Sequence, residues 1–148
     1  QLAHIGRYFT STVNVNDESF LAPESMREAL QMYCKRTGQA VPETECELLY
    51  CVYHSLAKCY AETVAEIEEV TGKRFAQIHV VGGGCQDSFL NGLLQKHTGK
   101  NVYAGPVEAT AIGNLMAQML KDDVFEDLSE ARQMVAKSFD VKAITPVF

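Results

Sequence analysis

The spacing of apolar residues in the first half of the chain predicts two helices. The first carries apolar side chains at positions i, i+3, i+4 and i+7, namely Met26, Ala29, Leu30 and Tyr33. It is expected to begin at Pro23 and to end at Gly38, a residue type that commonly follows a helix. The second helix is indicated by a stripe that recurs every three to four positions from Leu49 to Val70. Because a short segment separates them, we expect an antiparallel helical hairpin.

Local signals define the ends of the second helix. Thr44 can cap its first turn, and Glu47 stands where it completes a capping box. Gly72 ends the helix, which is therefore expected over residues 45–71. Residues 1–22, by contrast, form an irregular lead-in in which only Thr10–Val15 indicates a short strand.

The pattern changes in the second half of the chain to short strands followed by helices. The β-branched run Ile78–Val81 predicts a strand that ends at the three glycines Gly82, Gly83 and Gly84. His79 lies in the middle of this strand and is expected to be a core histidine. After the glycines, an apolar stripe predicts a helix that ends at Gly99.

A second strand and two more helices complete the predicted order. Asn101–Ala104 is expected to be a strand, and Pro106 is expected to open the helix that follows it. The last helix is expected over residues 129–137, with Asp127 and Glu130 as its cap. Strands that alternate with helices are typical of an α/β layer with parallel strands, so the fold class is α/β and helix-rich.

Two parallel strands alone make a poor sheet. We therefore expect the early strands of the domain to be missing from this chain and to lie before Gln1. The chain begins with Gln and not with Met, which agrees with a chain that starts inside a longer protein.

Composition limits the possible partners and the compartment. The 148 residues carry a formal net charge of −6, and no run of Lys and Arg offers a basic face for nucleic acid or an anionic membrane. No apolar segment has the length of a membrane span, and no signal peptide follows Gln1. The chain has five cysteines, an odd number, and they form no C-x-x-C motif. This pattern predicts free thiols, a cytoplasmic location and no metal site.

Cys34 and Cys51 stand on the two helices of the expected hairpin and could face each other. A disulfide is conceivable there, but two buried thiols are the preferred interpretation for a reducing compartment.

The glycine run at 82–84 is the candidate binding site. Glycines let a ligand approach the main chain closely, and the start of the following helix offers unpaired N–H groups to phosphates. The run is neither a G-x-G-x-x-G fingerprint, because position 87 is Asp, nor a Walker A loop, because no Gly-Lys-Ser/Thr follows. The pattern favours a nucleotide site, and a tight turn without a ligand stays the alternative.

The segment Gly105–Asn114 is the second marked feature. Ala109, Gly113 and Ala117 repeat every four residues and form a ridge of small side chains. Such a ridge lets another element pack closely, and packing is the preferred interpretation over contact with a ligand.

Five segments together resemble the C-terminal half of the FGGY carbohydrate kinases, and within that family the members that act on L-rhamnulose. The resemblance is carried by Phe20–Met26, Cys34–Pro42, Ser55–Ala57, His79–Gln86 and Ala104–Ala109, and it extends over nearly the whole chain. Either of the last two segments would be moderately specific alone, and together they are highly specific.

The resemblance implies an actin-like ATPase fold with two ribonuclease-H-like domains, of which residues 1–148 would be part of the C-terminal, nucleotide-binding one. Members of the family transfer the γ-phosphoryl group of ATP, accompanied by Mg²⁺, to a sugar hydroxyl, here the 1-hydroxyl of L-rhamnulose. Gly83 would contact the nucleotide, Gly82 and Gly84 would shape the loop, and Glu108–Gly113 would form a supporting helix.

The resemblance also implies what the chain lacks. The catalytic Asp of the family stands upstream of the matched region, so no catalytic residue is expected after Gln1. The chain alone is therefore expected to be inactive without the N-terminal domain of the parent protein. With its first strands missing, it is expected to self-associate or to pack Leu2–Val15 across the gap.

Asp87 departs from the Asn that the family usually has after the sequence Gly-Gly-Gly-Cys-Gln. An amide could donate a hydrogen bond to a nucleotide, whereas an ionised carboxylate only accepts. We favour the interpretation that Asp87 caps the following helix, since Asp and Asn cap about equally well.

Parts of the sequence also suit two other classes of function. A helical interaction module, which binds a partner through residues 45–71 and no nucleotide, stays the alternative. A Rossmann-type NAD or S-adenosylmethionine domain would need an acidic residue at the end of the next strand. That strand ends in Tyr103-Ala104-Gly105, so this class is excluded.

Overall fold

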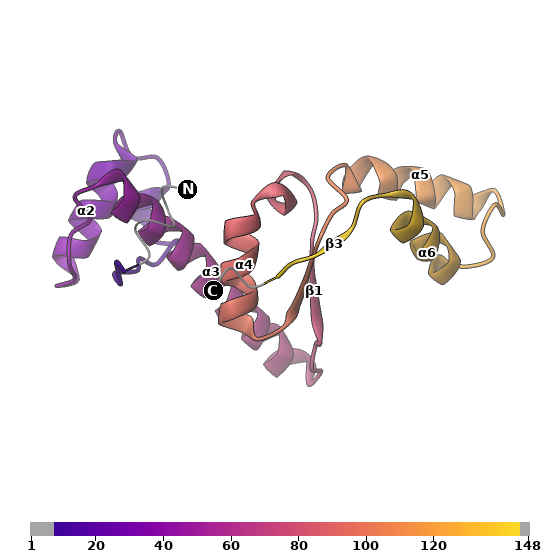
Figure 1. Cartoon of the computed structure of the whole chain (residues 1–148), viewed down its shortest axis with the longest axis horizontal. Coiled ribbons are helices and arrows are strands. Elements are labelled where there is room, and N and C mark those ends of the chain that lie inside the picture. Colours follow the sequence, from indigo (N-terminus) through magenta and orange to yellow (C-terminus); the bar gives the residue numbers. More distant parts are fainter. Residues whose placement is uncertain (1–7, 146–148) are drawn as a thin grey trace. The chain divides into compact units, whose positions relative to one another are not determined.

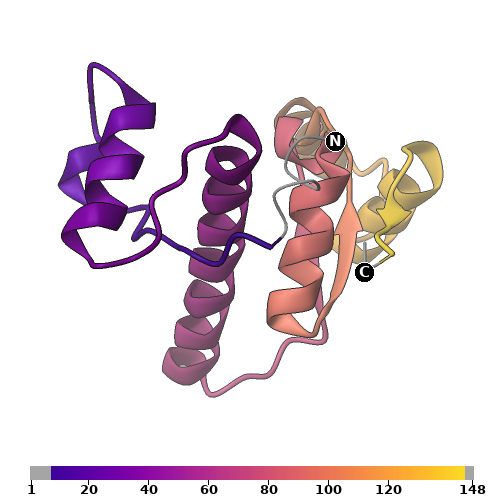
Figure 2. The same ribbon diagram turned by 60° about the vertical axis from the view of Figure 1, so that its left-hand side comes forward.

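The computed structural model of the chain describes residues 8–145 (Figure 1). It divides into two compact units, Gln1–Arg74 and Phe75–Phe148, and each is described by itself. The first unit contains the short 3₁₀ helix η1 (Glu18–Phe20) and the helices α2 (Met26–Arg36) and α3 (Glu45–Thr71). Both predicted helices of this half are thus confirmed, and α2 lies beside the first half of α3 (Figure 2).

The helix α2 begins three residues later than predicted. Its N-cap is Ser25, whose hydroxyl accepts a hydrogen bond from the Glu28 amide at 3.3 Å. The predicted end is confirmed, because Gly38 has a φ of 69° and donates its amide to the Lys35 carbonyl. The Gln39 amide donates to the Cys34 carbonyl, and the two bonds together form a Schellman motif.

The predicted capping box of α3 is present. The Thr44 hydroxyl accepts a bond from the Glu47 amide at 3.2 Å, and the Glu47 carboxylate accepts one from the Thr44 amide at 3.0 Å. The helix ends at Gly72, which adopts a left-handed conformation with a φ of 65°. Local sequence therefore determines both ends of this helix.

The segment predicted as the strand Thr10–Val15 is not a strand. Side chains bind its backbone instead: the Gln39 side-chain amide, just after α2, donates to the Thr12 carbonyl and accepts from the Thr12 amide. The Val13 amide donates to the Ser55 hydroxyl at 2.9 Å. Because these side chains already satisfy the backbone, the segment needs no partner strand.

The lead-in also contributes to the core of the first unit. Val13 is buried together with residues from both helices, namely Leu30, Cys34, Leu48 and Cys51. The irregular appearance of residues 1–22 in the sequence thus concealed a residue that packs between the helices. Residues 1–7 of the lead-in lie outside the described residues.

Ser55 connects the lead-in to α3. Its hydroxyl accepts from the Val13 amide and donates to the Cys51 carbonyl at 2.6 Å, and its side chain is 1% exposed. We expect Ser55→Ala to lower the free energy of unfolding by about 1–3 kcal/mol, because it leaves the Val13 amide buried without a partner. Denaturant titration measures this.

Thr63→Ala is the matched control, since the Thr63 hydroxyl donates to the Cys59 carbonyl in the same way but lies in an exposed setting. We expect this variant to change stability by less than about 0.5 kcal/mol. Equal losses in both variants would contradict the role of Ser55.

Cys34 and Cys51 are both fully buried and are free thiols. Desolvation raises the pKa of Cys34, and desolvation together with the neighbouring Cys34 raises the pKa of Cys51 to about 12. Both groups are therefore neutral and unreactive in the folded unit at physiological pH.

The second unit contains a three-stranded sheet in the order β1-β2-β3. The strands β1 (Gln77–Val80) and β2 (Asn101–Ala104) pair in parallel, with Ile78 opposite Val102. This confirms the two predicted strands and their direction. The helix α4 (Ser88–Thr98) connects them and contacts β2, where Val102 and Ala104 are buried.

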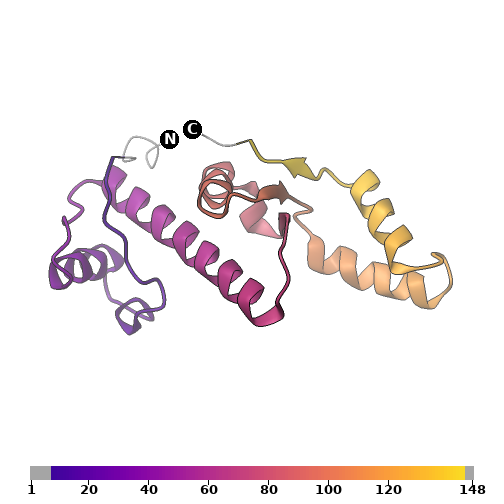
Figure 3. The same ribbon diagram turned by 90° about the horizontal axis from the view of Figure 1, so that it is seen from below.

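A third strand, which the sequence did not predict, pairs with the other edge of β2. It is β3 (Lys142–Ala143), antiparallel to β2, with Ala143 opposite Tyr103 and Lys142 opposite Ala104. The sheet is therefore mixed. The helices α5 (Ala109–Lys121) and α6 (Leu128–Ser138) form an antiparallel pair (Figure 3).

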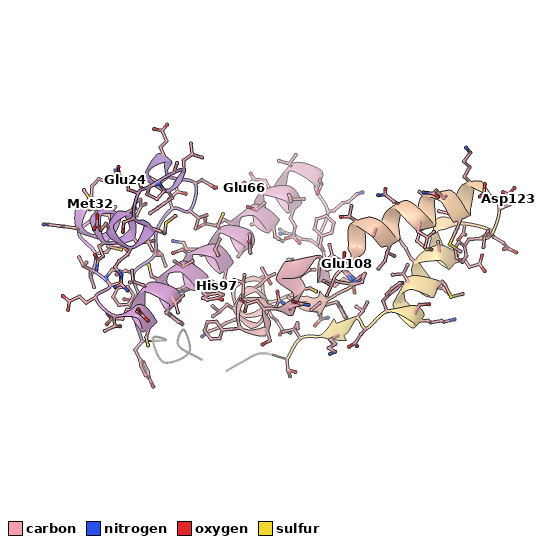
Figure 4. All side chains as sticks on the ribbon, turned by 90° about the horizontal axis from the view of Figure 1, so that it is seen from above. Glu24, Met32, Glu66, His97, Glu108 and Asp123 are labelled. Carbon is pink, nitrogen blue, oxygen red and sulfur yellow. The ribbon has the colours of Figure 1, made fainter. Side chains whose placement is uncertain are left out.

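The cap of α6 is confirmed, and the start of α5 is a correction. The Asp127 carboxylate accepts from the Glu130 amide at 2.8 Å, as predicted. Pro106 does not open α5, because its carbonyl accepts a bond from the Gly82 amide and the helix begins only at Ala109. Glu108 stands at the start of α5 and Asp123 at the turn to α6 (Figure 4).

Candidate functional site

The glycine run forms an open loop at the end of β1. Gly82 has a φ of 75° and a ψ of −166°, a conformation that is open essentially only to glycine. A 3₁₀ turn, η2 (Gly83–Gln86), follows it, so the glycines do not lead directly into α4 as the sequence predicted. Gly83 and Gly84 are exposed, and a Cβ built on either would meet no atom within 4 Å.

Backbone amides of the loop are available to a ligand. The first hydrogen bond of η2 runs from the Cys85 amide to the Gly82 carbonyl at 3.1 Å. The amides of Gly83 and Gly84 precede this bond and have no partner within the turn. Two neighbouring N–H groups without side chains around them suit a polar ligand that approaches the main chain closely.

Hydrogen bonds anchor the loop at both ends. At its start, the Gly82 amide donates to the Pro106 carbonyl at 3.1 Å. At its far end, the side-chain amide of Asn91 donates to the Cys85 carbonyl at 3.0 Å. Asn91 is 1% exposed and Cys85 is buried. The exposed glycines are thus held between two fixed points. Neither anchor was recognised in the sequence: the first joins residues far apart along the chain, and the second is made by a side chain six positions from its acceptor.

Asp87 caps α4, as the sequence analysis favoured. Its carboxylate accepts a hydrogen bond from the Leu90 amide at 3.0 Å. The carboxylate also places negative charge at the helix N-terminus. The start of α4, which the sequence suggested as the phosphate-binding element, is therefore a poor place for an anion, and the amides of Gly83 and Gly84 are the better donors.

Substitutions of Asp87 test the cap. We expect Asp87→Ala to lower the free energy of unfolding by about 1 kcal/mol, because the Leu90 amide loses its partner. Asp87→Asn keeps a side-chain oxygen at the cap and is expected to stay within about 0.5 kcal/mol of the original stability. Thermal unfolding of the three proteins compares them, and equal losses in both variants would contradict a capping role.

An apolar groove of about 750 Å³ lies beside the loop in the second unit. Its lining includes Val81 and Pro106, together with the predicted ridge of Ala109, Gly113 and Ala117 on α5. The ridge thus faces the groove, and no described side chain fills the groove in front of it. Its apolar lining favours a packing surface, as the sequence analysis preferred.

The start of the expected supporting helix Glu108–Gly113 lies close to the glycine loop. Glu108 is the N-cap of α5, and its side chain makes no capping hydrogen bond. The segment just before it touches the loop instead, since a Cβ on Gly82 would lie 4.0 Å from the Val107 carbonyl oxygen.

His79 is not a core histidine. Alternation along β1 places it with Tyr103 on one face of the sheet, where the two rings stack with their centroids 5.2 Å apart. Its Nε2 lies 3.2 Å from the Gln77 side-chain nitrogen, and the residue is exposed. The β-branched neighbours Ile78 and Val80 point to the other face, and they are less exposed than His79.

Residues 8–145 also bear on metal binding and on membrane insertion. No group of three or more His, Cys, Asp or Glu side chains in this part of the chain is placed to hold a metal ion. None of its helices combines the length and the apolar character that crossing a membrane requires.

Comparisons with known proteins match the chain to one family. The C-terminal domain model of the FGGY family of carbohydrate kinases matches residues 8–121. The chain is 49% identical over 137 residues to a rhamnulokinase of Halalkalibacterium halodurans and 46% identical over 138 residues to one of Bacillus subtilis. A rhamnulokinase of Oceanobacillus iheyensis is 46% identical over 136 residues.

These alignments cover 92–93% of the chain but only 28–29% of the relatives. The chain therefore spans less than a third of the length of the curated relatives it matches.

Proposed function

The chain belongs to the FGGY family of carbohydrate kinases, and from this we propose that it is the C-terminal, nucleotide-binding part of a kinase that phosphorylates L-rhamnulose. The whole protein would transfer the γ-phosphoryl group of ATP to the 1-hydroxyl of the ketose. The similarity to several rhamnulokinases, at 42–49% identity, supports the choice of sugar.

The nucleotide would bind at the glycine loop. The observation that carries this proposal is the pair of exposed glycines whose amides have no partner within their turn, at the carboxyl end of a parallel strand. Ligands of open α/β sheets bind at that end of the strands. Gly83 would contact ATP, and Gly82 and Gly84 would give the loop its shape.

Phosphoryl transfer depends mainly on positioning and on neutralising charge. The residues of this chain would contribute to positioning, because neutral backbone donors would hold the nucleotide against the loop. Mg²⁺ would be bound through the phosphates of ATP, since the described residues offer no cluster of metal ligands. The base that accepts the proton of the sugar hydroxyl would come from the N-terminal domain of the parent protein.

The chain would form part of a ribonuclease-H-like domain with an actin-like arrangement. The outer edge of β1 supports this, because no strand among the described residues pairs with it. The strand, Gln77–Val80, contains no Pro, Lys or Glu, the residues that commonly prevent an edge strand from pairing with another chain. A further strand of the parent domain would complete the sheet there.

An unprotected edge predicts the behaviour of the isolated chain. We expect it to self-associate, and sedimentation velocity at increasing concentration would show this. A monomer at all concentrations would contradict the proposal that the sheet is incomplete.

Kinetics on the intact protein that carries this chain test the function. We expect ADP formation that depends on L-rhamnulose and is much slower with other ketoses, while residues 1–148 alone show none. Phosphorylation by the isolated chain would contradict the proposed division of labour. The alternative, a helical interaction module that works through α3, would give an intact protein without kinase activity or ATP binding.

A further inference from the structure

The last part of the chain lies beyond the region that the family model matches. The family match ends at residue 121, whereas α6 and β3 follow it. An alignment of 137 residues within a chain of 148 must run at least to Lys137, so the similarity to the rhamnulokinase of H. halodurans includes nearly all of α6. Residues 122–145 therefore lie beyond the matched region, and their contacts indicate what they do.

Residues 122–145 return to the sheet beside β2. The Ile144 amide donates to the Val102 carbonyl at 2.8 Å, and Lys142 stands opposite Ala104. These pairs fix the register of β3, so the residues just before it are brought to the end of β2.

The backbone just before β3 makes a close contact with Gly105, which directly follows β2. Gly105 is buried and has a φ of 112°, and a Cβ on it would lie only 2.6 Å from the Asp140 carbonyl oxygen. The backbone of Val141 lies nearby, with its Cα 3.5 Å from the same point. The main chain of residues 140–141 therefore packs directly on the backbone of Gly105.

The turn at Gly105–Pro106, on which residues 140–141 pack, also holds the glycine loop. The Gly105 amide donates to the Val80 carbonyl at 2.9 Å, and the Pro106 carbonyl accepts from the Gly82 amide at 3.1 Å. Gly83 and Gly84 have no atoms close enough to hold them by packing. The orientation of the loop thus depends on a turn that residues 122–145 support.

We propose that residues 140–144 are a positioning element of the nucleotide site, which holds the Gly105–Pro106 turn against the glycine loop. The link to the nucleotide rests on the proposed function, while the mechanical link to the loop does not.

A pair of proline substitutions in β3 tests the mechanical link. Ile144→Pro removes the amide that bonds to Val102. In an antiparallel pair successive residues point their amides alternately toward and away from the partner, so the Ala143 amide points away from β2. Ala143→Pro is therefore the matched control, one residue away on the same strand.

The readouts are amide hydrogen exchange over residues 82–86 and the alkylation rate of buried Cys85, located by peptide mass mapping. We expect Ile144→Pro to increase both rates about tenfold, the factor that corresponds to about 1.4 kcal/mol. Ala143→Pro is expected to change them less than about threefold. Alkylation of buried Cys34 in the first unit should be unchanged, which shows that the first unit stays folded.

If Ile144→Pro prevents folding, Ile144→Gly keeps the amide and weakens the strand, and a smaller increase at the loop is expected. If hydrogen exchange at the loop is equal in the unchanged protein and in the Ile144→Pro variant, the positioning role is overturned. Where only Ile144→Gly folds, equal exchange in that variant overturns it in the same way.

Kinetics on the intact protein carry the inference to the nucleotide. We expect Ile144→Pro to raise the KM for ATP several-fold, while the KM for the sugar and kcat change little. A loosened loop with an unchanged KM for ATP would overturn the proposed nucleotide contact, whereas an unchanged loop overturns the positioning element alone.

Discussion

Replacing Gly105 with alanine is expected to destabilise the second unit by about 3 kcal/mol, within the range for strained backbone positions. Two physical causes add together. The residue has a φ of 112°, where L-residues with a side chain are strained. Its new Cβ would also stand 2.6 Å from the Asp140 carbonyl oxygen, which is a backbone atom and cannot move aside by a change of rotamer.

Gly113→Ala is the matched control for this prediction. Gly113 lies inside α5 without a positive φ, and a Cβ on it would meet no atom within 4 Å. The control is therefore expected to stabilise by about 0.5–1 kcal/mol, because alanine favours the helix. Chemical denaturation of both variants gives the comparison. Equal stability of the Gly105 variant and the unchanged protein would contradict the close approach of residues 140–141.

Features that depend on a few neighbouring residues could be predicted from the sequence. The Thr44–Glu47 capping box, the Asp87 and Asp127 caps and the glycine ends of three helices follow from local hydrogen bonds. The first of the two parallel strands followed from its β-branched run, Ile78–Val81. In each case the residues that determine the structure lie within one or two turns of the feature.

Features that depend on distant residues could not be predicted. Thr10–Val15 has strand-like residues, but the side chains of Gln39 and Ser55 satisfy its backbone. The strand β3 has only two residues and no alternating pattern, and it exists because β2 offers a free edge.

The same division applies to the candidate site. The three glycines stood out in the sequence, but the bond that holds the start of the loop, from the Gly82 amide to the distant Pro106 carbonyl, did not. Pro106 was interpreted as the start of a helix because prolines favour that position. In the structure its carbonyl serves the loop, and this use cannot be read from the residues around it.

A carboxylate at position 83 is expected to weaken ATP binding about a hundredfold while leaving the fold intact. Gly83 has no positive φ, and its surroundings are open to a side chain, so Gly83→Asp should melt within a few degrees of the unchanged protein. A negative charge 4 Å from a phosphate costs about 4 kcal/mol at an effective dielectric constant of 20, and solvent at this exposed loop reduces the effect to roughly 3 kcal/mol.

Separate effects on the two substrates make the test specific to the nucleotide site. In the intact protein, the KM for ATP should rise while the KM for the sugar changes little. Asn101→Asp is the control for charge, because it adds the same carboxylate to an exposed position at the opposite end of the parallel strands. A Gly83→Asp protein with an unchanged KM for ATP would show that the nucleotide does not approach this loop. A rise in both variants would instead indicate a long-range charge effect, which added salt would screen.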